Sequence, residues 1–135
     1  MKTAEAFAAV ALAAVACDGT LGRDEAHALR RQLEYRSLYN SCSEAAMAEL
    51  FDRLLAMLRE HGVQGLIESS LPVLSRRQQQ VALAVAAHLV HADRKVTDEE
   101  TAFLHQLAIQ VSLPDDEARM VIDSIEALNC PMLES

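Results

Sequence analysis

The sequence predicts an all-α fold, a compact bundle of about seven helices in a single domain that spans residues 1–135. Hydrophobic residues make up 51% of the chain and are mostly alanine, leucine and valine, whereas aromatic residues make up 4% and tryptophan is absent. Side chains in this proportion favour closely packed helices over a sandwich or a barrel. Only four glycines and three prolines interrupt the chain, so we expect few and long helices.

An internal repeat divides the chain into two halves. The segment 9–29, "AVALAAVACDGTLGRDEAHAL", aligns without a gap with the segment 84–104, "AVAAHLVHADRKVTDEETAFL". The identical pairs, each 75 positions apart, are Ala9 and Ala84, Val10 and Val85, Ala11 and Ala86, Val15 and Val90, Asp18 and Asp93, Glu25 and Glu100, and Leu29 and Leu104. The repeat predicts two pseudo-repeated three-helix halves, about 3–61 and 73–129, around a short linker helix.

The apolar run over residues 3–17 is expected to be a buried central helix and not a secretory leader. It is apolar on nearly every side, which is typical of a helix surrounded by others. The run carries Glu5 at its start and is too short and too rich in alanine to span a bilayer. Its copy at 81–92 lies inside the chain, where no leader can lie.

The second helix is expected to begin near Arg23 and to continue through Tyr39. Its apolar positions have helical spacing and are Ala26, Leu29, Leu33 and Leu38.

A capping box at Ser41 and Glu44 is expected to open the third helix, which Gly62 ends. The short linker helix then occupies residues 63–71, before Pro72. Ending a helix at glycine is common because glycine adopts the left-handed backbone conformation at no steric cost.

Ser75 and Gln78 have the spacing of a second capping box, and the helix that they open is expected to end near Ala92. In such a box, each of the two side chains binds the backbone N–H of the other residue, which satisfies two donors that the helix leaves open.

The last two helices have the strongest start signals in the chain. Thr97 and Glu100 form the clearest capping box and open a helix that continues to about Ser112. Pro114 and the acidic run 115–117 suit the first turn of the final helix, because carboxylates stabilise the positive end of the helix dipole.

Net charge and the number of cysteines limit the expected partners and the expected cellular compartment. With 20 acidic and 12 basic side chains, the chain has a net charge of −8, which is the wrong sign for neutralising phosphates and excludes nucleic acid as an expected partner. Cys17, Cys42 and Cys130 form no CxxC pair, and an odd count fits a reduced, cytoplasmic protein.

The stretch "DGTLGRDE" resembles the second half of an EF-hand calcium loop. With Asp18 at position 5, Gly19 takes the glycine position and Glu25 the closing glutamate position. The first two ligand positions are then Ala14 and Ala16, which offer no side-chain oxygen. A self-contained EF-hand is therefore rejected, and two carboxylates at a helix joint remain.

Two copies of this helix-joint motif, at 16–25 and 91–100, identify a family resemblance. Each follows an alanine-rich helix and has a version of the pattern A-x-D-G-x-[LIV]-x-x-x-E. This duplicated pattern resembles that of the tellurite-resistance TerB-like family over about residues 7–128. The departures from the family pattern are Gly22 in the first copy and His91, Arg94 and Lys95 in the second.

The resemblance implies an acidic, all-helical bundle that is cytoplasmic or attached to the inner face of the membrane and works through protein partners. Family members are associated with resistance to tellurite and other stress, and related domains occur in membrane-anchored DnaJ-like co-chaperones. The His-Pro-Asp tripeptide of a J-domain is absent from this sequence.

The resemblance also implies an acidic cation site, whose residues map onto Asp18, Glu25, Asp93 and Glu100. Oxygen ligands of this kind suit a hard divalent cation such as calcium. Arg94 places a cation beside Asp93 and lowers the expected affinity of the second copy. If the two apolar helices run parallel, the four carboxylates lie at one end of the bundle, whereas antiparallel helices would place the two pairs roughly 20 Å apart.

A purely structural interpretation of the same four residues stays open. Glu25 and Glu100 can accept from backbone N–H groups at the starts of their helices. Asp18 and Asp93 can accept from turn N–H groups just past a helix end.

A rival metal hypothesis rests on histidines. His88 and His91 are three positions apart on one expected helix and can share a face. Zinc would need a third protein ligand, for which the candidates are His27, His105 and Cys17.

No catalytic signature supports an enzyme. The sequence has no G-x-S-x-G, P-loop, H-E-x-x-H or glycine-rich dinucleotide motif. Two function classes remain, both without catalysis: a cation-binding stress-response module, and a metal-free protein–protein interaction domain that acts near the membrane.

Overall fold

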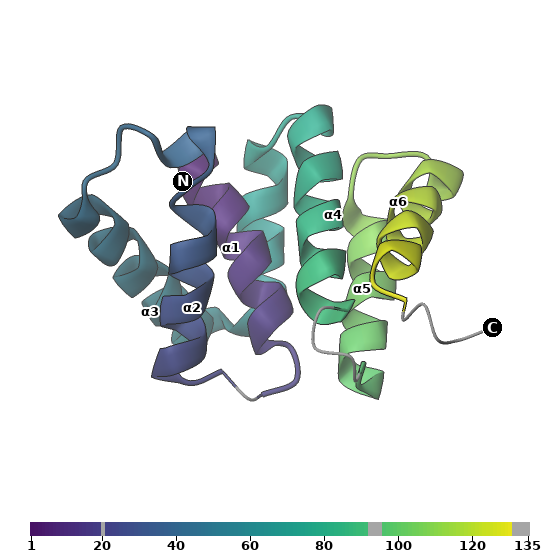
Figure 1. Cartoon of the computed structure of the whole chain (residues 1–135), viewed down its shortest axis with the longest axis horizontal. Helices are drawn as coiled ribbons and strands as arrows, with labels where there is room; N and C mark the ends of the chain where they lie inside the picture. The colour runs from purple at the N-terminus through teal and green to yellow at the C-terminus, as the bar shows by residue number, and fades with distance from the viewer. Residues whose placement is uncertain (20, 92–95, 131–135) are drawn as a thin grey trace.

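The computed structural model describes residues 1–19, 21–91 and 96–130. These residues form six α-helices and two 3-10 helices and contain no strand, which confirms the all-α prediction (Figure 1). The helices are α1 (Thr3–Ala16), α2 (Arg23–Leu33), α3 (Glu44–Ser70), α4 (Arg76–His91), α5 (Asp98–Gln110) and α6 (Asp115–Leu128), and the 3-10 helices are η1 (Ser37–Tyr39) and η2 (Leu71–Val73).

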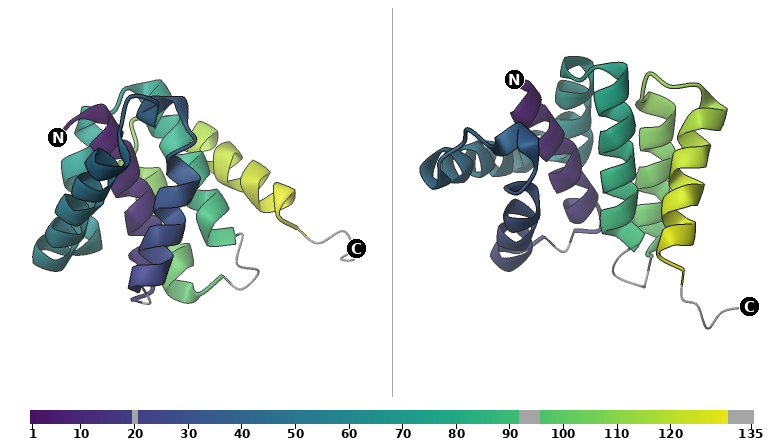
Figure 2. Two further views of the ribbon diagram at one scale, coloured as in Figure 1. Left: turned by 60° about the vertical axis from the view of Figure 1, so that its left-hand side comes forward. Right: turned by 45° about the horizontal axis from the view of Figure 1, so that its top comes forward.

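Helix α1 lies at the centre of the bundle, as its all-round apolar sequence predicts. Every residue from Ala6 to Ala14 is buried. Helices α3 and α4 pack against α1, α2 crosses it, and α5 and α6 lie beyond α4 (Figure 1, Figure 2). Six of these nine residues are alanine. Small side chains let neighbouring helices approach closely.

The predicted extent of the second helix is wrong, because α2 ends at Leu33 and not at Tyr39. The chain turns there and forms η1, which directs the Tyr39 ring into the core, where its hydroxyl donates to the Ala4 carbonyl at 2.7 Å. Burying an aromatic ring with a satisfied hydroxyl outweighs one more helical turn. Leu38, predicted to face the core, is 37% exposed.

The capping residue of α3 is Ser43 and not Ser41. Ser43 has an extended backbone, and its hydroxyl accepts from the Ala46 N–H at 3.0 Å. Gly62 breaks the helical geometry as predicted, with φ +75°, but the helix continues beyond it to Ser70. The range labelled α3 therefore consists of two helical segments joined by a kink at Gly62, and the second segment, which ends at Ser70, lies where the short linker helix was predicted.

The later start signals are confirmed. Ser75 and Gln78 cap α4 reciprocally, at 2.8 and 3.1 Å. Pro114 precedes α6, whose first turn is acidic. None of the helices described combines the length and apolar character that a bilayer crossing requires.

Buried Gln79 ties α4 to two connections. Its amide nitrogen donates to the carbonyls of Leu71 and Leu74 at 2.9 and 3.2 Å, and its amide oxygen accepts from the Ser112 N–H at 2.6 Å. This one side chain thereby connects α4 to the segment that precedes it and to the α5–α6 connection, and these hydrogen bonds hold the end of α5 beside α4.

Candidate site at the helix joints

Two connections define the candidate site: the first joint (residues 17–25), from the end of α1 into the first turn of α2, and the second joint (residues 92–100), from the end of α4 into the first turn of α5. Helices α1 and α4 pack together and run in the same direction (Figure 1, Figure 2). The C-terminal ends of α1 and α4 and the N-terminal ends of α2 and α5 therefore lie at the same end of the bundle. This is the parallel arrangement that a shared site requires.

The first joint turns at Gly19. Its N–H donates to the Ala16 carbonyl at 3.0 Å, and its φ of +80° lies in the left-handed region that glycine occupies without strain. Asp18, just before the turn, is half-buried. The Cys17 thiol, also half-buried, donates to the Ala14 carbonyl at 3.2 Å.

Glu25 has a capping role at the end of this joint. The Gly22 N–H donates to its Oε2 at 3.1 Å. Gly22 has no side chain to return the bond, so only half of a capping box forms, and Glu25 is exposed.

The second joint ends in a complete capping box. The Thr97 N–H donates to Glu100 Oε1 at 2.9 Å, and the Glu100 N–H donates to Thr97 Oγ1 at 3.1 Å. Glu100 is only 9% exposed. A carboxylate has about four acceptor positions, so one capping bond leaves others for a cation.

Electrostatics link the two joints. Burial raises the pKa of the Cys17 thiol from 9.0 to about 12, and the carboxylates of Glu100, Asp18 and Glu99 raise it in addition. A carboxylate affects a thiol in this way only when the two lie close together. The second joint thus contributes negative potential at a residue of the first, and such potential attracts cations.

The full predicted carboxylate set reaches beyond the described residues, because Asp93 lies outside them. Within residues 1–19, 21–91 and 96–130, no group of three or more His, Cys, Asp and Glu side chains has an arrangement that could hold a metal ion. A site shared by Asp18, Glu25, Asp93 and Glu100 therefore stays a prediction.

The two histidines of the zinc hypothesis have different surroundings. His88 is exposed, and its Nδ1 lies 3.2 Å from the Asn129 side-chain nitrogen, which also donates to the Ile125 carbonyl at the end of α6. His91 is half-buried at the end of α4. His88 thus contacts α6, and the zinc hypothesis also stays a prediction.

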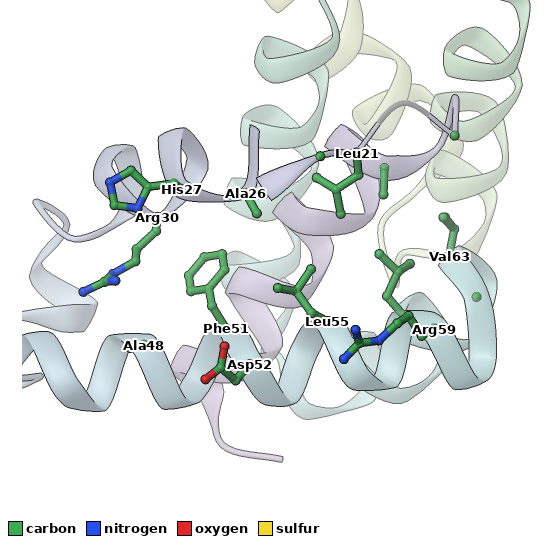
Figure 3. Close-up of a pocket in the computed structure, with 15 residues that line it drawn as sticks. Leu21, Ala26, His27, Arg30, Ala48, Phe51, Asp52, Leu55, Arg59 and Val63 are labelled. Atoms are coloured by element: carbon green, nitrogen blue, oxygen red, sulfur yellow. The ribbon is translucent and has the colours of Figure 1, made fainter. Parts of the chain in front are cut away.

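A feature that the sequence reasoning missed is a groove of about 840 Å³ between α2 and α3 (Figure 3). A signal for it was present on α3, where a second apolar stripe follows the one that faces α1. Its members are Ala48, Phe51, Leu55, Leu58 and Gly62, spaced alternately three and four residues apart. Two stripes make a face too wide for one neighbouring helix to cover.

Comparison with known proteins gives no assignment: no family model, no curated protein and no solved structure matches the chain.

Proposed function

We propose that this chain is a non-enzymatic, TerB-like stress-response module that binds a hard divalent cation such as calcium at the end where its two joints lie. The observation that carries the proposal is the parallel packing of α1 and α4 (Figure 1). An antiparallel arrangement would have separated the repeated carboxylates by roughly 20 Å.

The proposed ligands are Asp18, Glu25, Asp93 and Glu100. The three of them that the structure describes, Asp18, Glu25 and Glu100, do not form a metal-holding group as they stand, so the cation is proposed to draw their side chains together. Calcium accepts six to eight oxygen ligands in flexible geometry, so backbone carbonyls and water can complete the shell. The capping bonds orient Glu25 and Glu100 before any cation arrives, which lowers the entropy cost of binding. Acidic groups held at one end repel one another, and a bound cation relieves that repulsion.

Thermal unfolding with added calcium tests the proposal. A ligand that binds only the folded state stabilises it, by about 1.4 kcal/mol at ten times its Kd. Glu100→Gln should reduce this gain to about 0.4 kcal/mol at the same calcium concentration if binding weakens about tenfold, and it should keep the fold, because glutamine also completes a capping box. Asp115→Asn, at the start of α6 and at the other end of the bundle, is the matched control and should keep the gain (Figure 1).

Two results would refute the cation proposal. One is an unchanged unfolding temperature together with no calorimetric heat for calcium, magnesium or manganese. The other is equal stabilisation of the wild type and Glu100→Gln, which would place the cation elsewhere.

A metal-free interaction domain is the second candidate, and exposed apolar side chains favour it. Ile109 on α5 is 72% exposed, and Met120 and Leu128 on α6 are 68% and 71% exposed. Large apolar side chains on two neighbouring helices are typical of a docking surface when they are contiguous. Binding of a protein or a membrane surface that persists in chelator and is lost in Ile109→Asp would favour this candidate, with Gln106→Asp on the same helix as the control.

A further inference from the structure

The groove between α2 and α3 has the form of a ligand site. Its apolar lining comes from Leu21 and Ala26 on one side and from Phe51, Leu55 and Leu58 of α3 on the other (Figure 3). Along α3 the lining extends from Ala48 to Gly62, which corresponds to roughly 21 Å of helix. Its volume of about 840 Å³ falls in the range of small-molecule pockets, about 300–1,000 Å³.

Arg30 supplies an unpaired donor at this groove. Its Nη2 donates to the Glu44 carbonyl at 3.0 Å and lies 3.9 Å from the exposed Glu44 carboxylate, but its Nε is buried and has no hydrogen-bond partner in the described part of the chain. Burying a donor of a charged group without an acceptor is costly. The Arg30 side chain is still 16% exposed, so a ligand oxygen in the groove would meet the accessible part of the guanidinium; in Figure 3 this side chain extends from α2 towards α3 near Ala48.

The charge of the groove is opposite to that of the whole chain. The net charge is −8, whereas the groove is lined by Arg30, Arg59 and His27 and by one carboxylate, that of Asp52. Two guanidinium groups beside apolar walls complement a molecule that combines an anionic group with an apolar body.

We propose that this groove binds a fatty acid, with the acyl chain over Phe51 and Leu55 and the carboxylate accepting from Arg30. The Arg30 guanidinium lies at the wall of the groove, where the carboxylate end of a slim acyl chain can approach its accessible part. A peptide helix, about 10–12 Å across, would rest on the rims formed by α2 and α3. The fatty-acid proposal does not depend on the cation proposal.

Calorimetric titration with laurate, in the presence of chelator, tests the proposal. The wild type should bind laurate and should bind dodecyltrimethylammonium, which has the same chain length and the opposite charge, at least about tenfold more weakly. Arg30→Met keeps the aliphatic stem and removes the guanidinium, so laurate binding should weaken by about tenfold or more. Arg31→Met, one position along α2 and exposed outside the groove, should bind like the wild type.

A second pair of variants tests the position of the chain independently of Arg30. Ala48→Trp places a large ring in the groove and should abolish laurate binding, whereas Ala56→Trp, exposed on α3 and outside the groove lining, should not. Laurate binding that survives Ala48→Trp would overturn the proposal. Failure of the wild type to bind laurate would also overturn it, and an acidic amphipathic peptide that binds here in its place would assign the groove to a helical partner.

Discussion

The two joints share one repeated sequence pattern, but different interactions stabilise them. In the first joint a backbone feature dominates, because Gly19 adopts φ +80° and the capping bond from Gly22 to Glu25 is one-sided and exposed. In the described part of the second joint, residues 96–100, Thr97 and Glu100 exchange two hydrogen bonds between side chain and backbone, and Glu100 is buried. The difference between the two capping bonds follows from one position, since Gly22 stands where the second copy has Thr97.

Both copies of the repeat place a glutamate at the same position of the helix start, but the hydrogen bonds around the two glutamates differ. Both glutamates accept a hydrogen bond from the residue three positions before them. Only Glu100 also donates its backbone N–H to the capping side chain, that of Thr97, so the structural role is stronger at Glu100 and a ligand role meets less competition at Glu25.

The largest expected effect tests whether the joints act on each other. Cys17 belongs to the first joint, and burial followed by the Glu100 carboxylate raises its pKa to about 12. At pH 9 iodoacetamide should therefore alkylate Cys17 about a hundredfold more slowly in the folded protein than in urea. Mass spectrometry of the Cys17 peptide measures this rate.

Glu100→Gln should lower the pKa of Cys17 and speed its alkylation, whereas Asp115→Asn should not. An unchanged alkylation rate in Glu100→Gln would show that the Glu100 carboxylate does not act on Cys17.

The raised pKa of Cys17 also affects stability, because the folded state keeps the thiol proton to higher pH than the unfolded chain. The contribution of Cys17 is fully present below about pH 9 and is lost as the pH rises towards about 12.

Gly19→Ala should have the largest effect on stability among changes at the joints. Among the residues that the structure describes, no atom other than those of its chain neighbours lies within 4 Å of a Cβ added at Gly19, so the expected cost comes from the positive φ. We expect a loss of about 1–2 kcal/mol in the free energy of unfolding by urea. Ala28→Gly on the exposed face of α2 gives the scale for an ordinary glycine–alanine exchange, and a Gly19→Ala variant as stable as the wild type would refute the backbone account of the first joint.

Thr97→Ala tests the side-chain account of the second joint. It removes the acceptor of the Glu100 N–H and should lower the free energy of unfolding by about 1 kcal/mol. Thr101→Ala, exposed on the same helix, is the matched control and should change stability by less than about 0.5 kcal/mol. Equal effects of the two substitutions would show that the capping box contributes little.

Gly22→Ser should give the first joint a two-sided capping box like that of the second joint. It has the smallest expected effect on the free energy of unfolding. The backbone of Gly22 is extended, which serine tolerates, and an added Cβ would lie 2.6 Å from Glu25 Oε2, the movable end of a side chain. A serine hydroxyl can complete the capping box, so we expect a gain of a few tenths of a kcal/mol, about 0.3. A clear loss in chemical denaturation would mean that the Glu25 position cannot adjust.

Local signals in the sequence predicted those parts of the fold that depend on neighbouring residues. The capping boxes at Ser75 and Thr97 and the buried helix α1 are of this kind. The end of α2 was not predictable in this way, because it depends on Tyr39 reaching the Ala4 carbonyl, a contact between distant parts of the chain.

The candidate site divides in the same way. The sequence identified Asp18, Glu25 and Glu100 as chemically suited residues and predicted the capping bonds of both glutamates. It left open whether the joints lie at one end, because the relative direction of α1 and α4 is set by packing. The groove between α2 and α3 depends on how far those two helices separate, which neither helix specifies alone.

The central claim, that both joints serve one cation, is tested most directly by calorimetric titration of calcium into the wild type, Glu25→Gln and Glu100→Gln. We expect one calcium per chain in the wild type, and either substitution should weaken that same binding event by on the order of tenfold. Absence of binding, or two independent events of which each substitution removes only one, would contradict a shared site.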